Sequence, residues 1–534
     1  MLGSTNTGID RITIDRLKVL EYVTIGISRV VVVKNAIANV VRGSATALIA
    51  IALPPFLIRA LSPDAFGAWS LILQLSSYAA LLDFGIQTAV GRFVAHAGEL
   101  RDTQRRDQIV STSLALLIGS AAIGVLLVGL LVWQLPTIFP QLPTELHRDA
   151  RIALLIVGGS VALGLPASVF NGIFIGLQRN EVPAAIITSS RVMIALLLIV
   201  AARLTGSLVL MAGVVAVVNV ASYGVQWWIA RHLARDVRIE RRLIAKQAGR
   251  ELIAYCFSLS IWSFATVLVV GLDTTLVGIF DFDAVAYYAL AASLITFLSG
   301  VQNALFNTLI SPAAVLDARG ASAELGETLT TATRYGMFVL LGVGLPLVFA
   351  TAPILQVWVG SAYVAATTPL VQILVIANII RLSAVPYAML LIGTGQQRLV
   401  ILTPFVEGGT NLLVSIIAGS LYGAIGVATG TLVGAGASMA FHIFWNLPRT
   451  TKIACTIRAY VGQGLLRPLV CAIPFTLFWL YTSIAAPVTP MTYTVLCGVA
   501  GLATLLCVWI WGLTLHDRQR MIALMRPLRS VWSR

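Results

Sequence analysis

Long apolar stretches separated by short polar segments run through almost the whole chain. Each stretch is long enough to cross roughly 30 Å of hydrocarbon as a helix. Four of the stretches are longer than a straight crossing needs, so each of these should tilt or break. The pair Pro54-Pro55 should also bend the first stretch, because proline removes a backbone hydrogen-bond donor. We predict fourteen spans, at residues 36–60, 65–96, 109–134, 151–177, 182–204, 207–230, 251–280, 284–315, 333–351, 364–392, 399–421, 424–446, 466–486 and 492–515, of which the second, seventh, eighth and tenth are the long ones.

The composition supports a chain that lies mostly in lipid. Apolar residues make up 58% of it, charged residues only 11%, and the mean hydropathy is +0.91. A soluble protein carries about 25% charged residues to maintain a hydrated surface. The five cysteines and five histidines show no ligand spacing, so no metal site is expected. These features predict an all-α, polytopic membrane protein.

The net charge of +14 does not indicate nucleic-acid binding, because the charges form no basic face. Most lysines and arginines lie in alternate gaps between the spans. If the N-terminus is cytoplasmic, 28 of the 36 fall in inner segments and only four in outer ones. This bias predicts that both termini are cytoplasmic. The multi-pass chain should lie in a bacterial cytoplasmic (inner) membrane.

A weak internal duplication appears at an offset of 219 residues. It pairs Asp64-Ala65 with Asp283-Ala284, and it aligns Gly176 and Gln178-Arg179 with Gly395 and Gln397-Arg398. The offset maps the first span onto the seventh, so the two six-helix lobes have the same orientation. They should be related by a pseudo-twofold axis along the membrane normal, with a site between them near the midplane. Two extra helices follow at the C-terminus.

This organisation divides the chain into six parts. The N-terminal part mixes charges with apolar positions at helical intervals, which is compatible with a surface helix or with a disordered tail. The parts are a cytoplasmic N-terminal segment (1–35), an N-lobe (36–231), a basic cytoplasmic loop (232–250), a C-lobe (251–447), the two last spans (448–515) and a basic cytoplasmic tail (516–534).

Three arginines within the predicted spans are candidates for substrate binding. An ionisable group at a helix centre costs at least about 2.5–3.5 kcal/mol, so it needs a polar cavity or a partner. Arg191 and Arg381 should lie near the midplane, and Arg42 lies roughly 9 Å from the inner end of its span. A guanidinium donates two hydrogen bonds to one phosphate, which predicts an anionic guest. The alternatives are a structural ion pair for Arg191 and Arg381, and snorkelling to the headgroups for Arg42.

Three carboxylates are candidates for coupling or for charge pairing. Asp83 lies far along the second span, and Asp273 lies in the outer third of the seventh. Either one could carry a coupling H⁺ or Na⁺, and either could equally neutralise an intramembrane arginine. Glu407 falls about one turn from the repeat position of Arg191, so these two could pair across the cleft. Apart from a coupling ion, no cofactor and no catalytic residue is expected.

Several short motifs carry a resemblance to a known family. They are Ser-Pro-Asp-Ala-Phe-Gly-Ala-Trp at 62–69, Asp-Phe-Gly-Ile at 83–86, Gly-Arg-Phe at 91–93, Gly-Ile-Phe-Ile-Gly-Leu-Gln-Arg at 172–179 and Tyr-Gly-Ala-Ile-Gly-Val-Ala at 422–428. Over roughly residues 36–450 the chain resembles Wzx-type polysaccharide flippases. These proteins belong to the multidrug/oligosaccharidyl-lipid/polysaccharide exporter superfamily.

The resemblance implies a transporter rather than an enzyme. The expected substrate is an undecaprenyl-pyrophosphate-linked oligosaccharide, flipped from the cytoplasmic to the outer leaflet for surface or exported polysaccharide. By family analogy, intramembrane arginines such as Arg42 would hold the pyrophosphate, and a polysaccharide polymerase and chain-length proteins are the expected partners. Fourteen spans rather than twelve resemble a lipid II flippase, which is one alternative. A drug or cation antiporter is a second alternative, but its cavity should contain more acids than arginines. A membrane glycosyltransferase or polysaccharide polymerase is less expected, because it would need larger outer loops.

Overall fold

The computed structural model describes residues 43, 45–484, 490–514 and 518 of the 534-residue chain. All regular elements within these residues are helices. Ten of the described helices are long and apolar enough to cross a membrane. The all-α, polytopic fold predicted from the sequence is therefore confirmed. The predicted N-terminal segment 1–35 and most of the tail 516–534 lie outside the described residues.

The predicted number of fourteen spans stays a prediction. The first span is a shorter apolar helix in its described part, Ala45–Ala60, and the last is a shorter one at Gly498–Gly512. The seventh is interrupted by a π-helix, and the eleventh and twelfth count once, as the stretch Gln397–Arg449, although Gly423 divides this stretch into two helical arms. The number of spans counted from helix length and hydropathy in the structure is therefore smaller than the number counted from apolar runs in the sequence.

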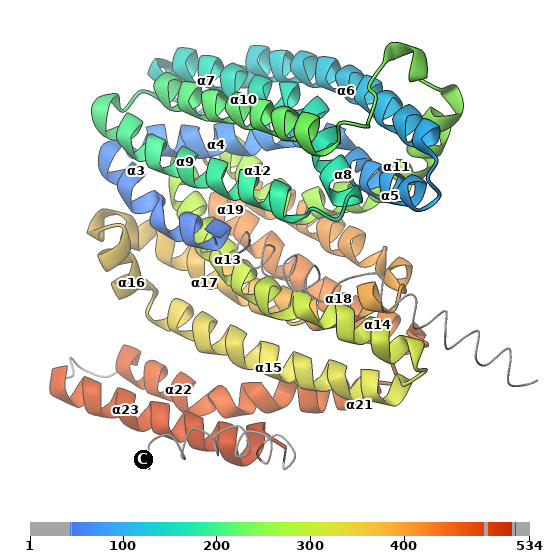
Figure 1. Ribbon diagram of the computed structural model, residues 1–534. Helices are drawn as coiled ribbons and strands as arrows, with labels where there is room; N and C mark the ends of the chain where they lie inside the picture. The colour runs from blue at the N-terminus through green and yellow to red at the C-terminus, as the bar shows by residue number, and fades with distance from the viewer. Residues whose placement is uncertain (1–42, 44, 485–489, 515–517, 519–534) are drawn as a thin grey trace, which may run out of the picture.

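The helices form stacked layers that follow the order of the chain (Figure 1). The upper half in this view contains α3 (Pro54–Ala60), α4 (Pro63–Tyr78), α5 (Ile86–Glu99), α6 (Thr103–Ile138), α7 (Thr144–Leu163), α8 (Ser168–Gly176), α9 (Glu181–Thr205) and α10 (Leu208–Leu233). The second half of the chain, most of which lies lower in this view, contains α12 (Asp273–Phe280), α13 (Val285–Phe306), α14 (Ile310–Ala318), α15 (Ser322–Phe349), α16 (Thr351–Trp358), α17 (Val364–Leu382), α18 (Val385–Gly393) and α19 (Thr403–Phe441). Helix α11 (Lys246–Thr266) joins them and contacts α5 and α6 as well as α19. The predicted domain boundaries themselves stay predictions.

All four of the long spans, for which the sequence predicted a tilt or a break, are broken. The breaks lie at Ala79–Asp83, Val267–Gly271, Asn307–Leu309 and between α17 and α18. The first span also breaks at Leu53, immediately before Pro54-Pro55, which confirms the predicted bend. The fourth span breaks at Leu165–Ala167, which its length did not predict.

The two halves repeat the same local features. Arg101 and Gly320, which are 219 residues apart, both have positive φ values, at 54° and 68°, and each lies in the turn before a long helix. The short helix α8 has its counterpart in α18, and each follows a break in its span. Corresponding breaks at corresponding places support the duplication that the sequence indicated.

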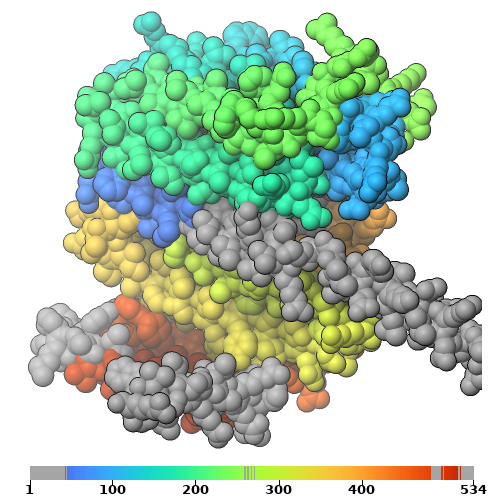
Figure 2. Space-filling model, viewed as in Figure 1, coloured from blue at the N-terminus to red at the C-terminus, as the bar shows by residue number. Residues whose placement is uncertain are grey.

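Within the described residues, the largest apolar core is shared by the two halves. One large apolar core combines residues of both, among them Trp69 and Phe139 of the first half and Val285 and Leu370 of the second. Two smaller cores lie toward the end assigned to the cytoplasm, and they are separate: one packs Leu252 of α11 against residues of the first half such as Val90, and the other lies within the second half. Figure 2 shows the halves stacked one on the other. The shared core lies at the end that the lysine and arginine distribution predicts to face outward.

The last two helices, α22 (Arg467–Ile484) and α23 (Pro490–Cys507), lie beyond α15 at the far edge of the second half (Figure 1). Helix α22 packs against α15 and α23, and the π-helix Tyr460–Leu466 before it also packs on α15. Gly512 lies against the ring of Phe338 on α15, so the far end of this pair contacts the same helix. The pair is therefore an addition to the two-half body.

Gly423 turns the helical stretch α19 back on itself. Its backbone has φ 58° and ψ −136°, a conformation that is essentially restricted to glycine. Asp281 Oδ2 accepts a hydrogen bond of 3.1 Å from the next backbone amide, Ala424 N. A Cβ at Gly423 would lie 2.3 Å from that same oxygen. The two arms of α19 thus form a hairpin that Gly423 makes possible.

We therefore expect Gly423→Ala to destabilise the protein by about 1–3 kcal/mol. The substitution combines backbone strain with the loss of the Asp281 cap, and a lower midpoint of thermal unfolding in detergent would measure it. Gly436→Ala is the matched control, because a Cβ there meets nothing within 4 Å. Equal melting of the two variants would contradict the strain at the turn.

Candidate functional site

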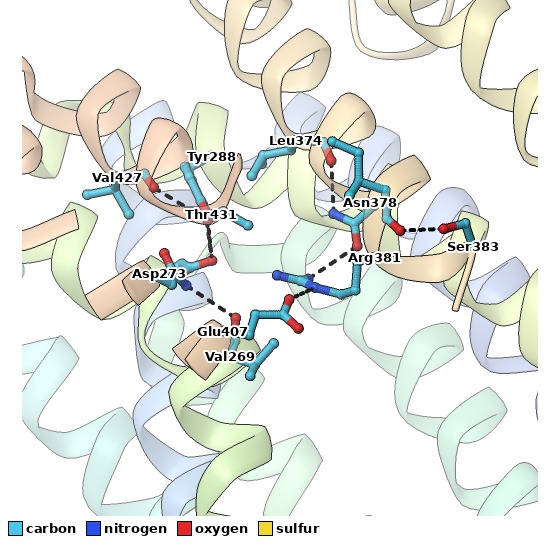
Figure 3. A network of polar contacts seen from close by, with 12 residues as sticks. Val269, Asp273, Tyr288, Leu374, Asn378, Arg381, Ser383, Glu407, Val427 and Thr431 are labelled. Carbon is cyan, nitrogen blue, oxygen red and sulfur yellow. Dashed lines mark hydrogen bonds and ion pairs between the residues drawn. The ribbon is translucent and has the colours of Figure 1, made fainter. Parts of the chain in front are cut away.

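A buried polar network lies in the second half, where Asp273 begins α12 (Figure 3). Its carboxylate accepts three hydrogen bonds from side chains on other elements. The donors are Tyr288 OH at 3.2 Å, Thr431 Oγ1 at 3.0 Å and Asn411 Nδ2 at 3.0 Å. Asp273 is only 8% exposed. A carboxylate in such surroundings is held by hydrogen bonds rather than by solvent.

The first arm of α19 supplies one face of this network. Thr403, Glu407, Asn411 and Ser415 recur every four residues, which places them on the same side of a helix. Ser415 Oγ lies 2.9 Å from Asn411 Oδ1 and 3.2 Å from the carbonyl oxygen of Val427 on the returning arm. The hairpin therefore brings the two arms into direct contact at the polar face.

Glycines on the returning arm permit this close approach. A Cβ at Gly430 would lie 2.1 Å from Ser415 Oγ, and one at Gly434 would lie 2.9 Å from the carbonyl oxygen of Glu407. Small residues let helix backbones come together in a membrane, where the hydrophobic effect cannot drive their association. The sequence thus builds the site with polar residues on one arm and small residues on the other.

The break before α12 exposes backbone carbonyl groups beside Asp273. The π-helix Val267–Gly271 interrupts the span, and Asn411 Nδ2 lies 3.3 Å from the Val269 carbonyl oxygen. From the first half, Gln74 Nε2 donates to the Gly271 carbonyl oxygen at 2.7 Å, and Tyr78 OH donates to the same oxygen. Tyr78 OH also lies 2.7 Å from Thr275 Oγ1. The broken helix is thus hydrogen-bonded to both halves.

Arg381 and Glu407 form an ion pair next to this network, and their side chains point at each other in Figure 3. The two side chains are 16% and 7% exposed. Arg381 Nη1 also donates to Asn378 Oδ1 at 3.3 Å, whereas its Nη2 is buried without a hydrogen-bond partner within the described residues. Both residues line a cavity of about 240 Å³ between α17, α18 and α19. This arrangement favours the ion-pair alternative for Arg381, and its role in substrate binding stays a prediction.

The other predicted residues lie apart from this network. Asp83 accepts a hydrogen bond of 2.6 Å from Ser168 Oγ at the break between α7 and α8. Arg191 is exposed on α9, and its Nη1 donates to Thr46 Oγ1 in the first span. Arg42 lies outside the described residues. The predicted roles of these three residues stay predictions, and so does the proposed meeting of Arg191 with Glu407.

Sequence reasoning missed the neutral members of the network, because it considered only ionisable groups. The four-residue spacing from Thr403 to Ser415 was a usable signal, since polar side chains on one face of a membrane helix indicate a buried partner. Tyr288 and Thr431 carry no such periodic signal. Together these side chains hold the buried Asp273 carboxylate by hydrogen bonds from three other segments of the chain. A buried carboxylate beside a broken helix is suited to binding a proton or a hard cation.

Known proteins resemble this chain in sequence and in fold. A family model described as "Polysaccharide biosynthesis protein" matches residues 32–314, which is more than half of the chain. The chain belongs to this family. A putative O-antigen transporter of Shigella flexneri is 24% identical over 151 residues, which cover 28% of this chain and 34% of that protein. The matched region thus covers about a third of the length of the Shigella flexneri protein.

Two solved structures share the fold. One is the lipid II flippase MurJ in an inward closed conformation, at a TM-score of 0.66 and 14% identity, covering 89% of this chain and 98% of that one. The other is an inward-facing multidrug resistance MATE family transporter of the MOP superfamily, at a TM-score of 0.61 and 13% identity, covering 76% and 97%. These findings confirm the resemblance drawn from the motifs. All three proteins are named as transporters or flippases, which agrees with the expectation that this polysaccharide biosynthesis family member is not an enzyme.

Proposed function

We propose that the protein flips an oligosaccharide linked to undecaprenyl pyrophosphate from the cytoplasmic to the outer leaflet. Membership of the polysaccharide biosynthesis family carries this proposal. The names of the Shigella flexneri relative and of the MurJ flippase point to a lipid-carried glycan as cargo. Such a substrate has a long apolar tail, a charged pyrophosphate group and a bulky polar head. The protein needs a suitable surface for each of these three parts.

A groove at the added helices suits the tail. Its volume is about 530 Å³, and it lies between α15 and the pair α22–α23. Phe338, Leu345, Phe475 and Leu505 are among the side chains that line it. A polyprenyl chain in this groove would exchange contacts with lipid for close packing against the apolar side chains. This groove favours a lipid-linked guest over a small soluble cation.

Arginines in the spans suit the phosphate. Arg191 presents an exposed guanidinium on α9 beside the first span, and Arg42 belongs to the sequence predicted for the same span. The buried Arg381 Nη2 would gain a partner from any anion that entered its cavity. Phosphate recognition by arginine benefits from two parallel hydrogen bonds. We assign Arg42 and Arg191 the first contact with the pyrophosphate, and Arg381 a second.

The two halves suit alternating access. They share one large core, whereas of the two smaller cores one packs α11 against the first half and the other lies within the second half. The halves could therefore separate at the end of the smaller cores, with α11 moving with the first half. We propose that Asp273 couples this movement to H⁺ or Na⁺. Its oxygen-rich surroundings lie beside a broken helix that both halves contact. Ion occupancy at such a break would change its hydrogen bonding and hence the contact between the halves.

Depletion of the protein in its host tests the cargo. We expect an undecaprenyl-pyrophosphate-linked oligosaccharide to accumulate on the inner leaflet while surface polysaccharide falls, and mass spectrometry of extracted lipids would identify the intermediate. Accumulation of lipid II instead would move the assignment to that alternative, which the fold likeness to MurJ favours. Retention of a cationic drug with normal lipid intermediates would contradict the flippase assignment altogether.

A further inference from the structure

A cavity of about 640 Å³ lies at the end of α10, where the chain leaves the first half. We call it the α10 cavity. Its inner wall is apolar and includes Phe170 and Ile173 of α8. Three arginines stand along its rim: Arg231 in the last turn of α10, and Arg235 and Arg238 in the segment that follows. An apolar wall below a row of guanidinium groups is suited to an amphipathic anion.

The acids near the α10 cavity are already engaged by other arginines. Asp236 is paired with Arg106 of α6, and Glu240 is paired with Arg242. The hydrogen bond from Arg242 lowers the pKa of the Glu240 carboxyl, so this acid stays ionised and paired at neutral pH. Within the part of the chain that the structure describes, Arg235 and Arg238 form no ion pair. The rim of the cavity therefore carries a net positive charge.

Aromatic side chains place the α10 cavity at the level of the lipid headgroups. Trp227 lines it, and the neighbouring Trp228 is 57% exposed. The Arg231 guanidinium lies 5.2 Å from the Trp227 ring centroid. Tryptophan is enriched at membrane–water interfaces, where arginine side chains can reach phosphate groups. By the lysine and arginine distribution, this end of α10 faces the cytoplasm.

We propose that the α10 cavity binds an anionic phospholipid of the cytoplasmic leaflet. The lipid phosphate contacts Arg231, Arg235 and Arg238, and one acyl chain lies against Phe170 and Ile173. The site is separate from Asp273 and from the groove at α22–α23, and it does not depend on the identity of the transported cargo. Basic residues in this position attract acidic headgroups by about 1 kcal/mol each.

Native mass spectrometry of the purified full chain with phosphatidylglycerol tests the proposal. We expect bound phosphatidylglycerol on the wild type, and binding weaker by about tenfold or more in the double variant Arg235→Gln, Arg238→Gln. The control double variant Arg241→Gln, Arg250→Gln removes two exposed arginines of the same basic stretch outside the cavity lining. It should bind like the wild type. All the replaced side chains are exposed, so the variants should fold, and size-exclusion profiles check this.

Three further ligands separate the possible occupants. Equal binding of phosphatidylcholine would reduce the site to an unselective apolar groove, and displacement of phosphatidylglycerol by inorganic phosphate would make it a simple anion site. Displacement by a short-chain polyprenyl pyrophosphate at lower concentration would assign the cavity to the transported cargo. Each of these results would overturn the proposal, as would unchanged binding in the first double variant.

Discussion

Asp273→Asn is expected to reduce transport to the level of membranes without the protein, while leaving the protein inserted and folded. Asparagine keeps the size of the side chain and can still bond to Thr431 and Tyr288, so the local packing should survive. The asparagine amide does not take up a proton at neutral pH. It also offers a cation only one neutral carbonyl oxygen, in place of a charged carboxylate. The measurement is uptake of a labelled short-chain polyprenyl-pyrophosphate glycan into reconstituted vesicles under an imposed ion gradient.

Asp283→Asn provides the control, because this carboxylate belongs to the repeat motif but is exposed. It should transport normally. Comparing a Na⁺ gradient with a pH gradient in the wild type then shows which ion is coupled. Full transport by Asp273→Asn under both gradients would remove this carboxylate from coupling, and Asp83→Asn would become the next variant to test.

Arg381→Ala should strongly reduce the amount of folded protein. The substitution leaves the Glu407 carboxylate buried without its partner, and breaking a buried ion pair in this way costs about 3–5 kcal/mol. Removing both charges in Arg381→Ala, Glu407→Gln should restore folding, because a neutral amide is cheaper to bury than a carboxylate. Expression level and melting temperature of the two variants measure this difference.

Transport by the rescued double variant separates the two roles of Arg381. Activity lost in a well-folded double variant would indicate that the guanidinium also contacts the cargo. Activity retained would make Arg381 a purely structural partner of Glu407 and would contradict its place in the substrate site. Arg381→Lys gives a further comparison, since lysine keeps the charge but cannot reproduce the planar fork of hydrogen bonds.

Much of the fold could be predicted from the sequence, because lipid imposes simple rules on length and polarity. Apolar runs gave the positions of the helices, and their excess length gave the breaks at Ala79–Asp83 and Val267–Gly271. The break at Leu165–Ala167 was missed because the fourth span has nearly normal length. The turn at Gly423 lies between the predicted spans 399–421 and 424–446, so its position could be predicted. Its backbone conformation and the hydrogen bond from Ala424 N to Asp281 could not, because both depend on how the two arms pack.

The candidate site was harder to predict, because its geometry depends on contacts between distant segments. Asp273, Arg381 and Glu407 could be selected as costly charges, but the partner of each was set by helix packing. Sequence spacing suggested Arg191 for Glu407, whereas the structure places Arg381 beside it. Neutral residues such as Asn411 carry no desolvation signal of comparable size, although they complete the network.

The attachment of the loop 232–250 to the first half determines where a fluorescent reporter of the transport cycle is useful. Arg106 is hydrogen-bonded to both the side chain and the backbone of Asp236, and Thr112 Oγ1 accepts from the amide of Ala245. A dye on this segment would therefore follow the first half as one body instead of sensing the angle between the halves. Energy transfer between residue 241 and a position at the end of α14, such as Arg319 immediately after it, would record that angle. A single dye beside the break at Val267–Gly271 would record the change in local hydrogen bonding that we propose ion binding at Asp273 to cause.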